Sequence, residues 1–262
     1  MAKTDILKEI VQKKKERLLF AKQQLSEDEL KAKVQGLAPA RPFIKAINKP
    51  RQISLIAEIK KQSPSRGVIR PDFNLSEIAR VYQDAGVQAI SVLTEEDHFG
   101  GNISYINEVK SIAACPVLRK DFILEPYQVY ESRFYGADAI LLIADLLSKE
   151  KLTELMGLAG ELGLECLVEV HDDKELKKAV SLKAPLIGIN NRDLHTLEID
   201  PKTTERLFTL VPKDKVVVAE SGIKSYQDVL FLRILGVNAV LIGEAIMEAP
   251  SMQIKIEELM GW

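Results

Sequence analysis

The sequence predicts a (β/α)8 barrel with an N-terminal helical extension. From residue 53 onward, eight short apolar runs rich in β-formers alternate with helical patterns. The runs begin about 26 residues apart, a suitable length for one strand, one helix and their loops. Strands that alternate with helices form a parallel sheet with right-handed crossovers, and eight such units close into a TIM barrel. An open doubly wound sheet is the alternative, but no GxGxxG follows the first run, which weakens its dinucleotide-binding form.

The extension precedes the barrel. Residues 1–35 carry a partial apolar stripe on a Lys- and Glu-rich background, which predicts helix. The basic segment KKKER (13–17) is interpreted as a solvated helix face rather than a nucleic-acid contact. Gly36 and three prolines mark residues 36–52 as a connecting arm. We expect 1–52 to pack against one end of a barrel formed by 53–262, as one domain overall.

The predicted strands are short apolar runs that end in a turn or in polar residues: 53–59, 88–94, 116–121, 138–144, 164–170, 186–190, 215–221 and 238–243. Helical patterns between them include 75–86, 125–137, 148–163 and 225–236. Gly86, Gly163 and Gly236 end three of these helices shortly before a strand, because glycine is the usual residue at a helix C-terminus.

The composition excludes several classes of protein. The 262 residues are 46% hydrophobic and 28% charged with a net charge of −2, so a globular core is expected and a basic field for nucleic acid is not. Cys115 and Cys166 lack metal-ligand spacing and are interpreted as reduced thiols. His98, His171 and His195 are isolated, so we expect no metal site. Without an apolar run of membrane-spanning length or a signal-peptide core, a cytoplasmic protein is expected.

Polar residues interrupt the apolar runs where the predicted strands end, and a barrel carries its active site at that end. They are Glu58 and Lys60, Lys120 and Asp121, Glu169 and His171, Asn190, Arg192 and Asp193, and Glu220 and Ser221. Each could be a structural ion pair, but convergence on one face favours a catalytic centre. Burial and neighbouring charges can lower a lysine pKa and raise a glutamate pKa, which would supply an acid and a base near neutral pH. A Schiff base on Lys60 or Lys120 is the competing use.

The loops after the last two strands predict a phosphate site. In AESGI (219–223) and LIGEAIM (241–247), Gly222 and Gly243 let backbone N–H groups approach a ligand. A short helix beginning near Glu244 would point its N-terminus at the same place, while the Glu244 side chain is expected to turn away. Ser63 and Ser65, from the loop after the first strand, would add hydroxyl donors.

An apolar wall is predicted opposite the phosphate site. Phe99 stands at the tip of the loop TEEDHFGG (94–101), and Phe122 and Leu194 follow other strands. Together they could face an aromatic ring, although ordinary loop packing explains their spacing equally well.

Seven ordered motifs carry a resemblance to a known family: AEIKKQSPSRG (57–67), SVLTEEDHFGG (91–101), VLRKDFILEPYQVYESRFYGADAILLIA (117–144), LVEVH (167–171), IGINNRDLHT (188–196), VAESGI (218–223) and VLIGEAIM (240–247). The chain resembles the indole-3-glycerol phosphate synthase family of tryptophan biosynthesis. Two loop positions depart from the family pattern. His98 stands where Tyr is frequent, and Asn102 follows Gly101 where Ser or Asp is common.

The resemblance implies a cofactor-free and metal-free carboxy-lyase that closes the ring of 1-(2-carboxyphenylamino)-1-deoxyribulose 5-phosphate and releases CO2 and water. It implies that Lys120 is the general acid and that Glu169 is a base or a stabiliser of positive charge. Lys60 would bind the substrate carboxylate and serve as a second acid. Further implied site residues are Glu58, Asn190 and Glu220 as orienting groups, Arg192, Ser221, Phe99, Phe122 and Leu194 at the substrate, and Ser63, Gly222, Gly243 and Glu244 at the phosphate.

The implied protein is a cytoplasmic monomer with a small phosphorylated substrate, with no nucleic-acid or membrane partner, and open to loose association with other tryptophan-pathway enzymes. Two alternatives remain at this point. One is an aldolase or isomerase on a phosphosugar, with Lys60 or Lys120 as the Schiff base. The other is a catalytically silent phosphate-binding barrel, which would have no need for a costly cluster of buried charges.

Overall fold

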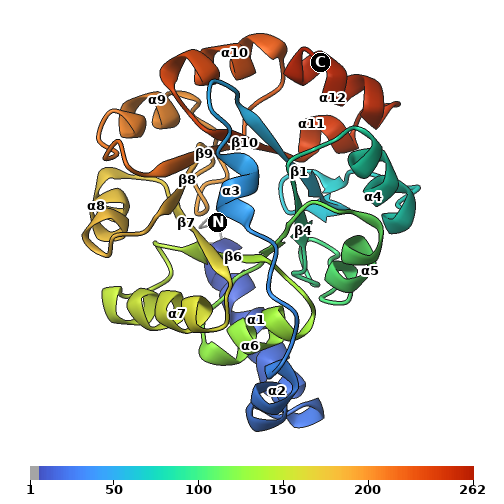
Figure 1. Ribbon diagram of the computed structural model, residues 1–262, viewed down its shortest axis with the longest axis vertical. Coiled ribbons are helices and arrows are strands. Elements are labelled where there is room, and N and C mark those ends of the chain that lie inside the picture. Colours follow the sequence, from blue (N-terminus) through green and yellow to red (C-terminus); the bar gives the residue numbers. More distant parts are fainter. Residues whose placement is uncertain (1–5) are drawn as a thin grey trace, which may run out of the picture.

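The computed structural model describes residues 6–262 and contains a closed barrel of eight parallel strands (Figure 1). The order around the barrel is β1-β10-β9-β8-β7-β6-β5-β4. The strands are β1 Ser54–Ile59, β4 Ala89–Leu93, β5 Val117–Lys120, β6 Ala139–Ile143, β7 Glu165–Val170, β8 Leu186–Asn190, β9 Val216–Glu220 and β10 Ala239–Ile242. Each predicted run contains one of these strands, and the prediction of a (β/α)8 barrel is confirmed.

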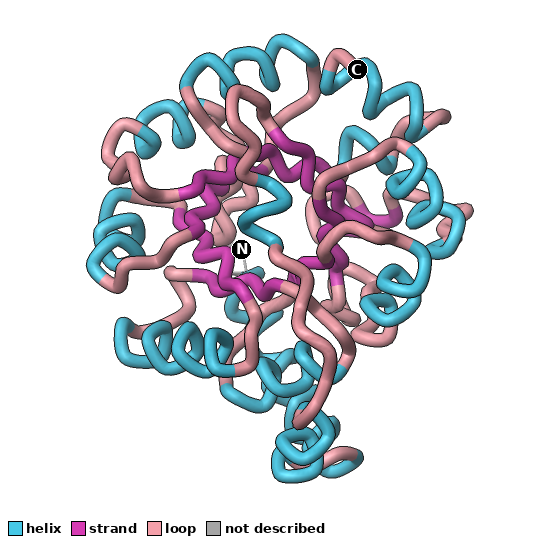
Figure 2. Tube along the Cα trace, in the orientation of Figure 1, coloured by secondary structure: helices cyan, strands magenta, loops and turns pink. Residues whose placement is uncertain are grey.

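Helices surround the barrel as an outer ring (Figure 2). They are α4 Leu75–Asp84, α5 Tyr105–Ile112, α6 Pro126–Phe134, α7 Lys149–Glu161, α8 Asp173–Ser181, α9 Lys202–Phe208, α10 Tyr226–Leu235, the short α11 Glu244–Met247 and α12 Met252–Met260. Local signals fix their ends. Ser148 and Ser225 accept backbone N–H groups at the starts of α7 and α10, and Gly236 ends α10 with a left-handed φ of 106°. None of the helices within residues 6–262 is long and apolar enough to cross a bilayer.

The side-chain alternation of each strand decides what enters the barrel. One cluster of buried apolar residues lies between strands and helices, and a second fills the barrel interior. In β1, Ile56 belongs to the interior cluster, and its neighbours Leu55 and Ala57 belong to the outer one. Because side chains two residues apart share a face, Glu58 also points inward, one layer closer to the C-terminal end. The interior therefore changes from apolar to charged toward that end.

The same parity holds in the other strands that carry polar residues. The interior cluster includes Leu118, Leu167, Val218 and Leu241. Two residues further along their chains stand Lys120, Glu169, Glu220 and Gly243. Strand register, rather than loop conformation, thus sets which predicted site residues face one another.

Within residues 6–52 the extension contains three helices, α1 Ile6–Gln24, α2 Glu27–Val34 and α3 Phe43–Ile47. The predicted helical stretch 1–35 is split at Ser26, which forms a capping box with Glu29, and its residues 1–5 lie outside the described part of the chain. The predicted arm contains α3, whose N-cap is Pro42. The sequence analysis did not predict this helix because it took the prolines as helix breakers, although proline is tolerated at the start of a helix.

The extension contacts both ends of the barrel, so the expectation that it packs against one end is wrong. Helix α3 lies over one end of the barrel (Figure 1). At these N-terminal ends of the strands, Phe43 and Ile47 are fully buried, and the Ile44 backbone N–H donates to Glu165 Oε2 at 2.7 Å. At the C-terminal ends, Lys14 of α1 pairs with Asp121, which directly follows β5. One segment of chain therefore contacts both the N-terminal and the C-terminal ends of the barrel strands.

The loop after β1 contains a small hairpin that the sequence analysis did not predict. Strand β2 Gln62–Ser63 pairs antiparallel with β3 Gly67–Val68. The Ile69 backbone N–H donates to the Lys61 carbonyl at 2.9 Å and closes the loop at its base. Four paired residues are too few to leave a period-2 pattern in the sequence.

Candidate active site

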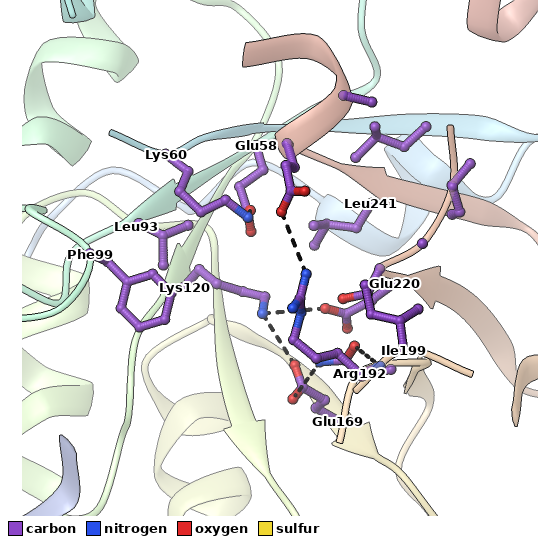
Figure 3. A pocket seen from close by; sticks show the side chains of 18 of the residues that line it. Glu58, Lys60, Leu93, Phe99, Lys120, Glu169, Arg192, Ile199, Glu220 and Leu241 are labelled. Atoms are coloured by element: carbon purple, nitrogen blue, oxygen red, sulfur yellow. Dashed lines mark hydrogen bonds and ion pairs between the residues drawn. The ribbon is translucent and has the colours of Figure 1, made fainter. Parts of the chain in front are cut away.

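A cavity of about 360 Å³ lies at the C-terminal ends of the strands (Figure 3). Most of the predicted site residues line it: Glu58, Lys60, Phe99, Lys120, Phe122, Glu169, Asn190, Arg192, Leu194, Glu220, Ser221, Gly222, Gly243 and Glu244. Ser63 instead lines a smaller cavity of about 70 Å³, which shares Lys60, Phe99 and Arg192 with the larger one. The two cavities therefore adjoin along these shared residues.

Lys120 lies between two buried carboxylates on the floor of the larger cavity. Its Nζ is 3.2 Å from Glu169 Oε2 and 3.3 Å from Glu220 Oε2 (Figure 3). Asn190 donates to the other oxygen of Glu169 at 3.1 Å. The missing side chain of Gly188 leaves space for Glu220 in this position, since a Cβ at residue 188 would meet Glu220 Oε1. Four strands thus fix one ammonium group between two carboxylates.

The charges of this cluster set its protonation. Burial alone would lower the pKa of Lys120, but the carboxylates of Glu169 and Glu220 outweigh it and raise that pKa. Burial favours the neutral form of Glu169, but Lys120 and His171 outweigh it and hold its pKa below the usual range. Burial, with the neighbouring Glu169 and Glu58, raises the pKa of Glu220 to about 8 despite Lys120. The cluster therefore favours a charged Lys120 and an ionised Glu169, whereas burial and the neighbouring carboxylates favour the neutral form of Glu220.

These directions correct one expectation from the sequence. A lowered lysine pKa was expected in the site, and for Lys120 this is wrong, because two carboxylates lie within 3.3 Å of its Nζ. A raised glutamate pKa is found, at Glu220. A lysine that stays protonated can donate a proton but is a poor nucleophile, which argues against the Schiff-base alternative at Lys120.

Lys60 forms a second charged pair above this floor. Its Nζ lies 2.9 Å from Glu58 Oε1, and both side chains face the cavity from the end of β1 (Figure 3). Gly243 gives Glu58 its space, because a Cβ at residue 243 would come within 2.5 Å of Glu58 Oε1. A glycine at residue 243 thus leaves space for the Lys60–Glu58 pair, and it also lets a ligand approach the backbone of the β10 loop.

The loops after β9 and β10 line the cavity with backbone suited to an anion. Ser221 and Gly222 both have a positive φ, of 64° and 79°, and both line the cavity. The predicted short helix is present as α11, which begins at Glu244 after Gly243. Left-handed φ is unusual for a serine, and loops at active sites often hold residues in such conformations.

The Glu244 side chain does not turn away from this region, so that expectation is wrong. Its two oxygens lie 3.2 Å from Arg66 Nε and 3.5 Å from an Arg192 nitrogen. Arg66 also pairs with Glu248 at 2.7 Å. The two guanidinium groups attract this carboxylate across the cavity mouth, an attraction that the spacing of residues in the sequence does not reveal.

The opposite side of the cavity is apolar. The rings of Phe99 and Phe122 lie 6.2 Å apart between centroids, and Leu194 packs with them in the same hydrophobic cluster. Ile6 and Leu7 of α1 line the adjoining smaller cavity against these residues. Both cavities therefore have an apolar wall to which the extension contributes.

Several residues that line the cavity escaped the sequence analysis. They are Arg66, Leu93, Leu141, Ile143, Ile199, Ile223, Lys224, Leu241, Ile242, Ala245, Glu248 and Lys255. Leu141 and Leu241 lie on the inward face of their strands, so strand parity could have identified them. Arg66, Ile199 and Lys255 come from a loop or from α12 and carry no comparable signal. Among the strand-end candidates, Asp121 lines the cavity but is held by Lys14 and Arg119, whereas Asp193 accepts turn N–H groups outside it.

The three histidines do not converge. His98 faces Glu9 and Glu95, His171 faces Glu169 and Glu175, and His195 Nε2 lies 2.9 Å from Asp145 Oδ2. In the part of the chain from residue 6 to 262, no three His, Cys, Asp or Glu side chains are grouped to hold a metal ion.

Solved structures of other proteins share the fold. The chain superimposes on 3-hexulose-6-phosphate synthase from Salmonella typhimurium with a TM-score of 0.64 and 18% identity, over 80% of this chain and 97% of that one. A chain of the tryptophan synthase complex from Pyrococcus furiosus gives a TM-score of 0.60 at 18% identity, over 80% and 98% of the respective chains. At this identity the likeness concerns the barrel alone.

Sequence relatives are much closer. Indole-3-glycerol phosphate synthase from Acetivibrio thermocellus is 48% identical over 255 residues, which are 97% of this chain and 98% of that protein. The proteins of the same name from Dehalococcoides mccartyi strain 195 and Caldanaerobacter subterraneus are 51% and 49% identical, over 87% and 95% of this chain. The family model described as "Indole-3-glycerol phosphate synthase" matches residues 7–259. The chain therefore belongs to the indole-3-glycerol phosphate synthase family.

Proposed function

We propose that this chain is a carboxy-lyase that converts 1-(2-carboxyphenylamino)-1-deoxyribulose 5-phosphate into indole-3-glycerol phosphate, CO2 and water. The observation that carries the proposal is the Lys120 ammonium group, held between Glu169 and Glu220 at the floor of a cavity. One side of this cavity is aromatic and the other consists of glycine-containing loops. The substrate has matching ends, an aromatic acid and a phosphate, and ring closure requires it to be held folded between them.

Lys120 is proposed as the general acid. Its raised pKa keeps it charged until the substrate binds, and its proton passes to the carbonyl oxygen as the ring carbon that bears the carboxylate attacks the carbonyl carbon. The carboxylate then leaves as CO2, and its bonding electrons restore the aromatic ring. In the last step the new hydroxyl group takes a proton from Lys60 and leaves as water, while the adjacent substrate carbon loses a proton to Glu169, so that the C=C bond of the indole forms.

Glu169 is proposed as the base of the dehydration or as the stabiliser of the positive charge that forms at the substrate nitrogen. It remains ionised, with a pKa below the usual range, which favours charge stabilisation in the resting site. Once Lys120 has given up its proton, the main cation near Glu169 is lost and its basicity rises. The same carboxylate can therefore serve first as a counter-charge and then as a proton acceptor.

Lys60 is proposed to bind the substrate carboxylate and to serve as a second acid, with Glu58 as its orienting partner at 2.9 Å. Asn190 and Glu220 would orient Glu169 and Lys120. Phe99, Phe122 and Leu194 would face the aromatic ring.

The phosphate is proposed to bind at the loops after β9 and β10, against Ser221, Gly222 and Gly243 and beside Arg192. Ser63 and Ser65 of the first loop line the adjoining smaller cavity, and they are proposed to reach the phosphate from there. Glu244 is proposed to contribute its backbone N–H group, while the phosphate displaces its carboxylate from Arg192.

We propose further that the protein works as a cytoplasmic monomer without cofactor or metal, and associates loosely if at all with other enzymes of the tryptophan pathway. Its two reduced cysteines are consistent with that compartment. Residues 1–52 and 53–262 are proposed as extension and barrel of one domain, since Lys14 of α1 and Phe43 and Ile47 of α3 are buried against the barrel.

The test is a fluorescence assay of indole formation with the purified full chain and the proposed substrate. Lys120→Met and Glu169→Gln are each expected to reduce kcat by about 10²–10⁴-fold while circular dichroism stays unchanged. Lys177→Ala, on the exposed face of α8, is the control and should retain parental turnover. Near-parental turnover in either folded variant would contradict the assigned role. Borohydride should trap no substrate adduct, and a trapped adduct on a lysine would support an aldolase-type reaction instead.

A further inference from the structure

His171 lies between two carboxylates directly behind the proposed site. It follows β7, and its side chain lines neither of the two cavities. Its Nε2 is 3.2 Å from Glu169 Oε1, and its Nδ1 is 3.0 Å from Glu175 Oε2. Only 12% of the side chain is exposed. Both nitrogens of a mostly buried ring therefore face carboxylate oxygens.

Glu175 is itself held in place. The same Oε2 atom that faces the ring also accepts the His171 backbone N–H at 2.9 Å. Glu175 stands on the first turn of α8, where its own N–H donates to the N-cap residue Asp172 at 2.8 Å. The carboxylate thus anchors both the main chain and the ring of His171, and rotation of the ring would break the contact.

The two contacts favour a doubly protonated ring, in which Nδ1 hydrogen-bonds Glu175 and Nε2 lies at ion-pair distance from Glu169 without an aligned hydrogen bond. A neutral imidazole carries a single N–H, so one nitrogen lone pair would face a carboxylate, whereas an imidazolium donates from both nitrogens. Burial alone would lower the pKa of His171, but Glu169 and Glu175 outweigh burial and raise this pKa to about 10. The ring is therefore a cation at neutral pH.

The charges around Glu169 come from several strands. From β5, Lys120 faces Oε2, and from β8, Asn190 donates to Oε1. Glu220 of β9 also contacts Lys120, and Glu58 of β1 adds to the negative charge around Lys120. His171 is thus the second cation in contact with Glu169, and unlike Lys120 it has no proposed proton to give up in the reaction.

We propose that His171 is a positioning residue of this active site, an imidazolium anchored by Glu175 that holds Glu169 Oε1 and keeps Oε2 directed at Lys120 and the cavity. The predicted effect of His171 on turnover rests on the proposed function, whereas its predicted charge and contacts do not. When Lys120 donates its proton, His171 retains a positive charge beside Glu169, so the carboxylate stays in place during the step in which it is needed. A merely structural role in the turn between β7 and α8 would change stability without changing catalysis.

The protonation of the ring can be measured without any substrate. In the full chain labelled with ¹⁵N-histidine, nitrogen chemical shifts should show the His171 ring doubly protonated at pH 8, with assignment by comparison with His171→Gln. A neutral ring at pH 8 would overturn the proposal. Because this measurement does not involve turnover, it remains informative if the indole assay fails and the proposed function is wrong.

The effect on catalysis is tested with His171→Gln, which keeps an N–H donor but removes the charge. We expect kcat to fall by about tenfold or more, as is typical when a group that orients a catalytic ligand is removed. KM should stay within about twofold, because the side chain lines neither cavity. The acidic limb of the kcat–pH profile should move up by about one unit, since loss of a neighbouring cation raises a carboxylate pKa.

Two further variants complete the experiment. Glu175→Gln keeps the ring but removes its anchor, and should shift the acidic limb in the same direction by a smaller amount. His98→Gln is the matched control, because His98 also faces two carboxylates but touches neither Glu169 nor Lys120, and it should leave the acidic limb in place. If folded His171→Gln and Glu175→Gln both retain the parental kcat and acidic limb, the proposal is wrong. If His171→Gln does not fold, the proposal is tested by the kcat–pH profile of Glu175→Gln and by the histidine nitrogen shifts of the parental chain. A parental acidic limb in Glu175→Gln or a neutral His171 ring at pH 8 would then contradict it.

Discussion

Lys14 Nζ lies 2.9 Å from Asp121 Oδ1, and this contact joins α1 of the extension to the residue that directly follows Lys120. Both side chains are buried, and Asp121 is held also by Arg119 at 3.0 Å and by the Thr94 hydroxyl at 2.6 Å. Burial favours the neutral form of Asp121, but Lys14 and Arg119 outweigh it and hold its pKa below the usual range. The extension is thus attached at the active end of the barrel by a buried charge.

Lys14→Met should therefore destabilise the protein and weaken substrate binding. Removing one partner of a buried pair typically costs roughly 3 kcal/mol in the free energy of unfolding, measured by urea denaturation. KM should rise severalfold, because α1 lines the smaller cavity with Leu7 and Ile10. Lys13→Met is the control, since its pair with Glu16 is half exposed and should contribute less than about 1 kcal/mol. An unchanged KM in folded Lys14→Met would show that α1 does not shape the binding site.

Gly243→Ala should impair catalysis through Glu58. The added methyl group would displace the Glu58 carboxylate from Lys60, so we expect kcat/KM to fall by about tenfold or more. Gly157→Ala, on α7, is the control: nothing lies within 4 Å of its Cβ, and it should raise stability by about 0.5–1 kcal/mol. Retained kcat/KM in Gly243→Ala would mean that Glu58 can move without consequence.

Lys60→Ala tests the anchor for the substrate carboxylate. We expect KM to rise and kcat to fall, because the ammonium group is proposed to act both in binding and as a second acid. Lys61→Ala serves as the neighbouring control, since Lys61 lines neither cavity and should keep parental kinetics. An unchanged KM in Lys60→Ala would contradict the anchor role and leave the acid role alone to explain any loss of kcat.

The stability of the ligand-free protein should fall as the pH rises from about 6.5 to 9. His171 has a folded-state pKa of about 10, above its unfolded value of about 6.5, so its contribution is complete below pH 6.5 and is lost toward pH 10. Glu220 has a folded-state pKa of about 8 instead of about 4.3, so the folded state also binds more protons than the unfolded state between those values. Both groups therefore make the free energy of unfolding decrease as the pH rises. Tm measured by calorimetry should decrease over this range.

Glu220→Gln and His171→Gln separate the two contributions to this pH dependence. Glu220→Gln should flatten the decrease below about pH 8, because it removes a group that protonates on folding. His171→Gln should flatten the decrease between about pH 6.5 and 10. A Tm that rises with pH across this range in the parental chain would contradict both pKa directions.

The sequence alone determined the barrel fold and the position of the charged side chains along the inward face of each strand. Eight apolar runs at regular spacing leave few arrangements, because parallel strands with helical crossovers must bury both faces of the sheet. Strand alternation then places Lys120 two residues after Leu118 and Glu169 two residues after Leu167, on the inward face of each strand. These are local, periodic properties of the chain, so they can be read from residue order.

Only the tertiary structure decided which charges touch and what protonation follows. The raised pKa of Lys120 depends on two carboxylates from β7 and β9. The Glu244 side chain faces the cavity, contrary to the expectation from the sequence, because Arg66 and Arg192 from distant loops attract it. Likewise α3 and α1 close opposite ends of the barrel although one arm connects them. Coulombic interactions and packing act through space, and residues far apart in the chain leave no periodic signal of their contact.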